Sequence, residues 1–379
     1  MVDLVEAIRG ELVARKTALA ERFSHVYSAS VGYHLWNQIN QVKGIYFEQG
    51  RLRNTRLHII MVAPPGFMKS YLIEQFLDGT HALLHDTGID VSFMDIVTEA
   101  GLIGTVKHGQ EGNVVIEQGA AHRHMYGIIG CDEFSGVTAM MKQGHSATLD
   151  PALLKLLDSG SIEKSLAAGE LKYTSHFSFW ASTQPMRFEL YGGLFRRFLP
   201  IEFVPTEYEK DLIRQHRRMG RNQKPSEMNL RNLRQGIKEL PVKMGRIKDV
   251  IFDPAMDKYF DGKKNIVPHF EEVVYERFAV GHTIMKGNFN ETLQIVFDKE
   301  LEGYMDKLID WRLQLKRGSA SSQVMRILGQ NNGTLKESEL KQELLDFGMT
   351  WSDSTILLSE MVRDRFVSRS GEVVRAMVT

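Results

Sequence analysis

A lysine–serine pair, Lys69-Ser70, follows an apolar run and the turn Ala63-Pro64-Pro65-Gly66. A turn of this kind at the start of a helix can hold a triphosphate. Its backbone N–H groups face the phosphates, and the lysine and serine add a positive charge and a magnesium ligand. The common pattern, G-x-x-x-x-G-K-[ST], fails at both glycines, where Ala63 and Met68 stand. The segment alone therefore leaves two interpretations open, a nucleotide site and an ordinary strand–turn–helix connection.

Two adjacent acids, Asp132 and Glu133, end a later apolar run, "MYGIIGCDEF". In a phosphate-binding sheet an aspartate at this place supports magnesium, and a following glutamate can polarise the attacking water. Neighbouring acids at a strand end are costly unless a cation and a water use them. The alternative is that Asp132 caps the next segment.

Polar residues, Ser182 to Gln184, end the next apolar run, and an arginine pair, Arg196-Arg197, follows Gly192-Gly193. Gln184 is placed to orient a lytic water. An arginine presented to a neighbouring subunit's phosphate acts as an arginine finger, worth roughly 10³–10⁵ in rate. Taken singly, these features also fit a polar strand end and a basic surface pair. The order of loop, acids, polar strand end and arginines favours the nucleotide interpretation.

Strand-like and helix-like segments alternate between about residues 51 and 205, and this alternation predicts how the elements position those residues. Strands are expected at "LHIIMVA" before the loop, 91–97, 125–134, 176–183 and 198–204. Helices are expected at "KSYLIEQFL" and at "DPALLKLLDSG", with Asp150 as its N-cap and Gly160 as its stop. The fold class is therefore predicted as α/β, with a three-layer parallel sheet.

The flanking regions are expected to be mainly helical. Residues 1–50 are expected to form helices leading into the ATPase-like core, and 206–315 a helical lid without strands, with helices over 270–284 and 292–315. "KRGSASS" (316–322) is expected to be a linker. Residues 320–379 are expected to form a winged helix-turn-helix that ends in a β-hairpin turning at Ser370-Gly371.

The composition limits the classes of protein. Of the 379 residues, 47 are Lys or Arg and 47 are Asp or Glu, so the net charge indicates no general affinity for nucleic acid. A single cysteine, Cys131, excludes a disulfide framework and a cysteine-rich zinc site. No apolar run approaches the ~20 residues of a membrane helix. We expect no membrane partner and a cytoplasmic location, nucleoid-associated if the source is a prokaryote.

Between about Val42 and Val204 these motifs resemble the minichromosome maintenance (MCM) family of hexameric AAA+ ATPases. "APPGFMKS" is similar to that family's Gly-Asp-Pro-Gly-x-Ala-Lys-Ser loop, with Ala63 for the first glycine and Met68 for alanine. "TEAGLIGTV" resembles its Ser-x-Ala-Gly-Leu-Thr-x-x-Val segment, and "EGNVVIEQGAAHRHMYGIIGCDEF" resembles its helix-2 insertion and the acidic strand that follows. "LLKLLDSGSIEKSLAAGELKYTSHFSFWASTQP" resembles its second hairpin and sensor strand, and "LFRRFLPIEF" its finger segment. The family's amino-terminal zinc and OB-fold domain has no counterpart in this sequence.

The resemblance implies ATP and Mg²⁺ as cofactors. The ATP-binding residues would be Pro65, Gly66, Phe67, Met68, Lys69, Ser70 and Tyr71. Ser70 and Asp132 would hold magnesium, Glu133 and Gln184 would act on water, and Arg197 would be the finger, with Arg196 as the second choice. The lid arginine of the family aligns with His269, and Arg277 is the alternative second sensor.

The resemblance also implies a homo-oligomer, most often a hexameric ring, with two hairpins that contact DNA in its channel. The corresponding lysines are Lys107, Lys164 and Lys172, which would contact phosphates without reading bases. We therefore expect a ring ATPase that translocates on or unwinds single- or double-stranded DNA. Two alternatives are a MoxR- or chelatase-like ring that remodels a protein, and a DNA-binding ring with little turnover.

Overall fold

The computed structural model describes residues 3–17, 20–45, 56–64, 66–67, 69–95, 97–108, 113–134, 149–166, 169–184, 195–203, 205–220, 227–346, 349, 351–363 and 365–377. Their contacts divide the chain into a larger unit within residues 1–309 and a smaller unit made mainly of residues 310–379. Each unit is described separately.

The larger unit contains a five-stranded sheet, in the order β2-β5-β8-β1-β9. Its strands are β1 (His58–Val62), β2 (Val91–Met94), β5 (Ile128–Cys131), β8 (Ser178–Thr183) and β9 (Phe198–Glu202). All four pairings between neighbouring strands are parallel. β1, β5 and β8 are buried along their whole length, as expected for continuous apolar runs inside a parallel sheet. The predicted parallel α/β fold is confirmed.

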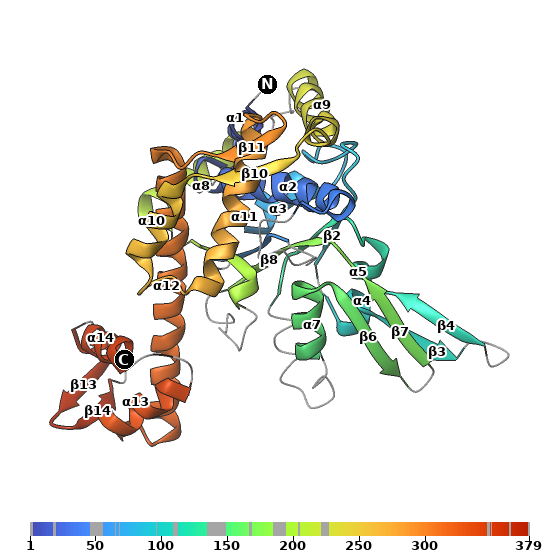
Figure 1. Ribbon diagram of the computed structural model, residues 1–379. Helices are drawn as coiled ribbons and strands as arrows, with labels where there is room; N and C mark the ends of the chain where they lie inside the picture. The colour runs from blue at the N-terminus through green and yellow to red at the C-terminus, as the bar shows by residue number, and fades with distance from the viewer. Residues whose placement is uncertain are drawn as a thin grey trace. The chain divides into compact units, whose positions relative to one another are not determined.

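Helices pack against this sheet and against each other (Figure 1). Their bounds are α1 (Leu4–Ala14), α2 (Ala20–Lys43), α3 (Lys69–Leu77), α4 (Glu99–Leu102), α5 (Ala120–Arg123), α7 (Leu149–Asp158), α8 (Glu207–Gly220), α9 (Glu227–Met244), α10 (Pro254–Lys263) and α11 (His269–Lys286). Trp180 of β8 joins three elements, because its ring lies 5.0 Å from that of Tyr27 on α2 and 5.5 Å from that of Phe76 on α3. Its indole N–H also donates to Ser30 on α2, at 2.8 Å.

Glycines allow α2 and α11 to cross at backbone distance. A Cβ on Gly281 would lie 1.9 Å from the carbonyl oxygen of Ala29, and one on Gly32 would lie 2.2 Å from that of Gly281. No side chain fits either position without separating the two helices. The crossing thus requires glycine because of close approach, and neither glycine has a positive φ.

We expect Gly281→Ala to lower the free energy of unfolding by about 1–3 kcal/mol or more, because overpacking forces the backbones apart. Thermal unfolding followed by circular dichroism measures the effect. Gly303→Ala is the matched control: Gly303 also lies inside a helix, but nothing lies within 4 Å of a Cβ there. That variant should gain up to about 1 kcal/mol. Equal melting temperatures for the two variants would contradict a tight crossing.

His34 of α2 is a buried link between α2 and the sheet. Its Nδ1 lies 3.0 Å from Ser178 Oγ, and its Nε2 lies 3.1 Å from the carbonyl oxygen of Tyr126. Burial lowers the pKa of His34 from 6.5 to about 4; the Tyr126 carbonyl raises it, and Arg56 lowers it further. The folded protein therefore holds this imidazole neutral.

Acidification from pH 6.5 to pH 4 is expected to destabilise the fold through His34. In that range the His34 imidazole binds a proton in the unfolded chain but not in the folded chain. The free energy of unfolding therefore decreases as the pH is lowered, by about 3 kcal/mol in total for this group. Urea unfolding at pH 7.5, 6 and 5 gives the slope. His34→Gln should make the slope shallower but not remove it, because the pKa values of His25, His176 and His282 are lowered as well. A slope unchanged by that substitution would exclude His34 as a contributor.

Two antiparallel hairpins extend from the sheet and lie side by side (Figure 1). One pairs β3 (Gly104–His108) with β4 (Val114–Gln118), and the other pairs β6 (Ser161–Leu166) with β7 (Gly169–Thr174). Both coincide with the hairpins expected from the sequence. The tip residues 109–112 and the turn residues 167–168 lie outside the described residues.

Three expectations for the larger unit and its boundary are wrong. The lid is not purely helical: β10 (Asp249–Phe252) and β11 (Thr292–Ile295) form a parallel pair, so the helix expected over 292–315 begins only at Lys299. The expected linker, 316–322, lies inside α12 (Lys299–Gln330). It contains one glycine and no proline, and a single glycine costs a helix only about 1 kcal/mol. Asp150 lies within α7, which starts at Leu149, so it is not the N-cap.

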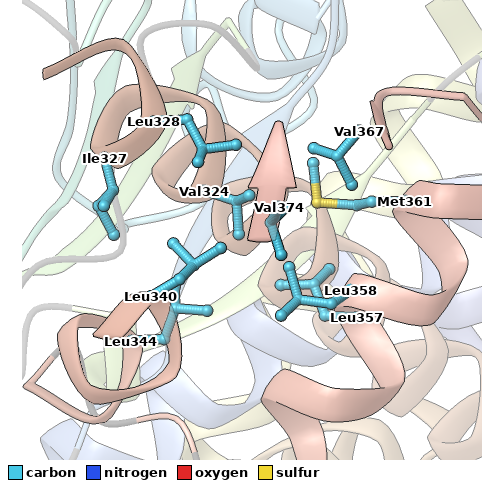
Figure 2. Packing of buried hydrophobic residues seen from close by; sticks show 10 residues of the cluster. All are labelled: Val324, Ile327, Leu328, Leu340, Leu344, Leu357, Leu358, Met361, Val367 and Val374. Atoms are coloured by element: carbon cyan, nitrogen blue, oxygen red, sulfur yellow. The ribbon is translucent and has the colours of Figure 1, made fainter. Parts of the chain in front are cut away.

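The smaller unit combines the end of α12 with α13 (Glu337–Asp346), α14 (Trp351–Arg363) and a three-stranded sheet in the order β12-β14-β13. These strands are β12 (Thr334–Lys336), β13 (Val367–Ser370) and β14 (Val373–Ala376), all antiparallel, with the expected turn at Gly371. Its core is formed by Val324, Ile327, Leu328, Leu340, Leu344, Leu357, Leu358, Met361, Val367 and Val374 (Figure 2).

Within the described part of the chain, no helix has the length and apolarity needed to span a bilayer.

Candidate nucleotide site

The loop between β1 and α3 carries the first predicted residues. β1 ends at Val62, and the N–H of Ala63 donates to the Thr183 carbonyl of β8 at 3.1 Å, so the loop leaves the sheet at a fixed point. Gly66 has a φ of 83°, a left-handed conformation that glycine adopts without strain. Phe67 and Tyr71 are half-buried, whereas Pro65 and Met68 lie outside the described residues.

Lys69 and Ser70 form the first turn of α3. Lys69 is 8% exposed and is therefore buried at the start of α3. The partial positive charge of a helix N-terminus adds to that of the lysine. A lysine is seldom buried without an anionic partner, and the position therefore suits a bound phosphate.

Next to Lys69 in the sequence, the hydroxyl group of Ser70 meets the Asp132 carboxylate and the Ser182 hydroxyl group. The Ser70 hydroxyl donates to the Asp132 carboxylate, and Ser182 Oγ lies 3.2 Å from the same carboxylate oxygen. Ser182 also donates to the Asp132 carbonyl. The N–H of Asp132 donates to the Met94 carbonyl at 3.0 Å, which fixes the acid beyond the end of β5. Ser70 and Asp132, predicted as a magnesium pair, are thus neighbours.

Glu133 and Gln184 form a second pair. Gln184 Nε2 donates to Glu133 Oε2 at 3.2 Å, across the ends of the neighbouring strands β5 and β8. The N–H of Phe134 donates to the Ser182 carbonyl at 2.9 Å and keeps the two strand ends together. A carboxylate and an amide in contact can position a water between an acceptor and a donor.

The electrostatics of the site indicate excess negative charge. Burial raises the pKa of Glu74, and Asp132, Asp78 and Asp95 raise it further. Sequence reasoning missed Glu74, although its position four residues after Ser70 places it on the same face of α3. Burial also raises the pKa of the Cys131 thiol to about 12, which keeps it protonated and excludes it as a nucleophile.

The donor set fits magnesium bound together with a nucleotide. Among the described residues, no three His, Cys, Asp or Glu side chains gather into a metal cage. Mg²⁺ does not need one, because it usually takes one or two protein oxygens and completes its shell with phosphates and water. Ser70 would supply one such oxygen and Asp132 a second, either directly or through water.

Arg197 lies at the other edge of the sheet. It belongs to the short 3-10 helix η4 (Phe195–Arg197), directly before β9, and β9 runs parallel to β1 with Phe198 opposite His58. Its guanidinium donates to Asp158 at 3.0 Å and is 11% exposed. Arg196 is exposed. Within one chain, Arg197 is therefore not brought together with Lys69 and Ser70.

The two candidate second sensors also lie away from the loop. Arg277, on α11, donates to the carbonyl of Arg56 at 2.9 Å, just before the start of β1. Arg277 thus lies, like Arg197, at the amino ends of the strands, and it does not reach the phosphate loop of its own chain. His269 is exposed at the first position of α11, with its ring against Phe270.

Lys107 and Lys172 each pair with an acid of the same hairpin. Lys107 lies 2.7 Å from Glu117, and Lys172 lies 3.3 Å from Glu163, each pair joining the two strands of one hairpin. All four side chains are about half exposed or more. Lys164 is half-buried. The sequence predicted lysines here but not the paired acids, which reduce the positive charge of both hairpins.

No protein-family model matches the chain, and no curated protein matches it.

Proposed function

We propose that this protein is an AAA+-type ATPase. The observation that carries the proposal is the convergence of Ser70, Asp132 and Ser182, with the Glu133–Gln184 pair beside them. These side chains lie at or beyond the carboxyl ends of β1, β5 and β8, which are adjacent and parallel, so they meet at the carboxyl edge of one sheet, where α/β folds bind ligands. The sheet order, with β8 between β1 and β5, suits a triphosphate on the loop and a water between the acids and the amide.

Each side chain then has one task. Lys69 neutralises the β- and γ-phosphates, and the N–H groups at the start of α3 hold the phosphate oxygens. Ser70 and Asp132 hold the magnesium, which offsets the negative charge of the phosphates and of the surrounding acids. Glu133 accepts the proton of the attacking water or orients that water, and Gln184 keeps the Glu133 carboxylate in place.

The MCM-like character of the proposed ATPase is supported by the two hairpins. One is inserted between α4 and α5, and the other between α7 and β8, in agreement with the sequence resemblance. The place of Arg197, at the edge of the sheet away from Lys69, supports a site completed by a neighbouring copy. On this proposal the active form is a ring, usually hexameric, and Arg197 and Arg277 face the next subunit's nucleotide.

For the substrate of the ring we propose DNA. Lys107 and Lys172 hold their acidic partners in exposed ion pairs, which are worth at most about 1 kcal/mol each. A DNA phosphate can displace such a partner at little cost. The contact would be to the backbone and would fall with salt, because it replaces counterions.

A protein substrate is the second candidate, and β4 is the observation that favours it. Val114, Val115 and Ile116 are 56%, 46% and 47% exposed on a strand that faces solvent along its whole length. Exposed β-branched residues next to charge-balanced hairpins suit an unfolded or extended peptide better than a phosphate backbone.

Hydrolysis of Mg·ATP by the purified chain, measured with and without forked DNA between about 50 and 200 mM salt, tests both proposals. DNA-stimulated hydrolysis that declines steeply with salt supports translocation on DNA. Hydrolysis that ignores DNA but responds to an unfolded protein supports the second candidate. Binding of ATP without hydrolysis would support the third alternative, a DNA-binding ring with little turnover. Failure to bind Mg·ATP would contradict the proposed ATPase function.

A further inference from the structure

The last turn of α7 is the base of the β6–β7 hairpin. α7 ends at Asp158, Gly160 turns the chain with a φ of 73°, and β6 begins at Ser161. The N–H groups of Ser159 and Gly160 both donate to the Lys155 carbonyl, at 2.9 and 3.1 Å, and that of Ser175 donates to the Gly160 carbonyl at 2.8 Å. A shift of this turn therefore moves the hairpin.

Three basic side chains hold this turn from the amino edge of the sheet. Arg56 donates to the Leu156 carbonyl at 2.6 Å, and His58 Nε2 lies 3.0 Å from the Leu157 carbonyl. Arg197 donates to the Asp158 carboxylate at 3.0 Å. The three contacts fall on three successive residues, so they cap the C-terminal end of α7, where the helix dipole favours positive charge.

The surroundings of Arg197 are rich in positive charge. Arg56 is fully buried, and burial together with the nearby Arg277 lowers its pKa to about 9, whereas Asp158 raises it. Burial lowers the pKa of His58 well below its usual range, and Arg56, Arg277 and Arg197 lower it further. Asp158 is thus a carboxylate that offsets the positive charge of Arg56 and Arg197, and its side chain is 54% exposed.

On the basis of the ATPase function proposed above, we infer that Asp158 is a positioning residue for the finger. It holds Arg197 inside its own subunit until the neighbour's γ-phosphate competes for the guanidinium, and loss of the Arg197–Asp158 pair then loosens the base of the β6–β7 hairpin. Asp158 offers Arg197 a 3.0 Å contact from a half-exposed carboxylate, whereas a phosphate offers arginine a stronger, bidentate partner. Binding of ATP to one subunit would thereby change the mobility of the β6–β7 hairpin in the neighbouring subunit that supplies Arg197.

Amide hydrogen exchange of the full chain tests this inference, with a non-hydrolysable ATP analogue and magnesium as the probe. The amides of Ser159, Gly160 and Ser175 report on the hairpin base, and that of Gly245, at the end of α9, serves as the reference. In the wild-type protein the analogue should accelerate exchange at the base by about two- to fivefold, the range that the loss of one exposed pair allows. In Asp158→Asn the faster exchange should be present without nucleotide, and the analogue should add little.

A matched variant and a conservative variant complete the design. Asp211→Asn removes the carboxylate of another exposed ion pair, that with Arg214, and should leave exchange at the base unchanged. Asp158→Glu keeps the charge and should restore the slow exchange. If Asp158→Asn exchanges like the wild type without nucleotide, or if the analogue accelerates exchange equally in both, Asp158 does not hold the finger. Failure of the wild type to bind the analogue would instead contradict the proposed ATPase function. The comparison of the wild type with Asp158→Asn in the absence of nucleotide tests the role of Asp158 independently of that outcome.

Discussion

Replacing Lys69 by alanine is expected to abolish ATP binding. The ammonium group is buried at the first position of α3, where the helix N-terminus attracts anions but cannot alone offset the charge of a triphosphate. Removing one partner of a buried charge pair costs about 2–5 kcal/mol, and we therefore expect the dissociation constant of Mg·ATP to rise by about 30-fold or more.

Calorimetric titration with Mg·ATP measures the loss, and thermal unfolding without nucleotide shows whether the variant is folded. Lys258→Ala, at an exposed position of α10, is the matched control and should bind as the wild type does. A folded Lys69→Ala protein with undiminished affinity would show that the loop does not grip phosphate, and the proposed function would have to be abandoned.

The sequence was sufficient to predict that candidate site residues from separate segments lie together at the strand ends. Apolar runs are easy to recognise, and whatever polar residue follows a parallel strand must lie at the carboxyl edge of the sheet. This is why Ser70, Asp132 and Gln184 could be assigned to one site from separate segments of the chain. Their mutual contacts follow from the strand order, with β8 between β1 and β5, which the sequence does not specify.

The features that escaped prediction depend on contacts distant in sequence or on short, mixed segments. β10 and β11 are four residues each and carry both polar and apolar residues, so their pattern resembles that of the adjacent helices. Asp158, the partner of Arg197, lies 39 residues before it and gives no local signal. The continuity of α12 through 316–322 was missed because serine and glycine suggest a linker, although neither prevents a helix.

The two edges of the sheet divide the proposed work between subunits. The carboxyl edge carries Lys69, Ser70 and the acids, and the amino edge carries Arg56, Arg197 and Arg277. The length of one strand separates the two sets of residues, so no side chain at the amino edge can contact a nucleotide on the phosphate loop of its own chain. A hydrolysing enzyme of this design must therefore assemble, and its turnover should depend on protein concentration.

Replacing Glu133 by glutamine is expected to stop hydrolysis while ATP stays bound. The amide keeps the size of the side chain and a partner for Gln184, now 3.2 Å from Glu133, but it cannot take a proton from water. Loss of a general base lowers the rate by roughly 10²–10⁴-fold. Affinity should change little, because Lys69, Ser70 and the start of α3 hold the nucleotide and Glu133 does not.

Single-turnover hydrolysis and calorimetric binding, measured on the same preparation, separate the two effects. Glu239→Gln, at an exposed position of α9, changes the charge by the same amount and should leave both quantities unaltered. If Glu133→Gln hydrolyses ATP at the wild-type rate, the base is another group, and Glu74, whose pKa is raised by burial and by Asp132, is the next carboxylate to test. If instead the variant no longer binds ATP, the acid pair belongs to the binding of magnesium rather than to the activation of water.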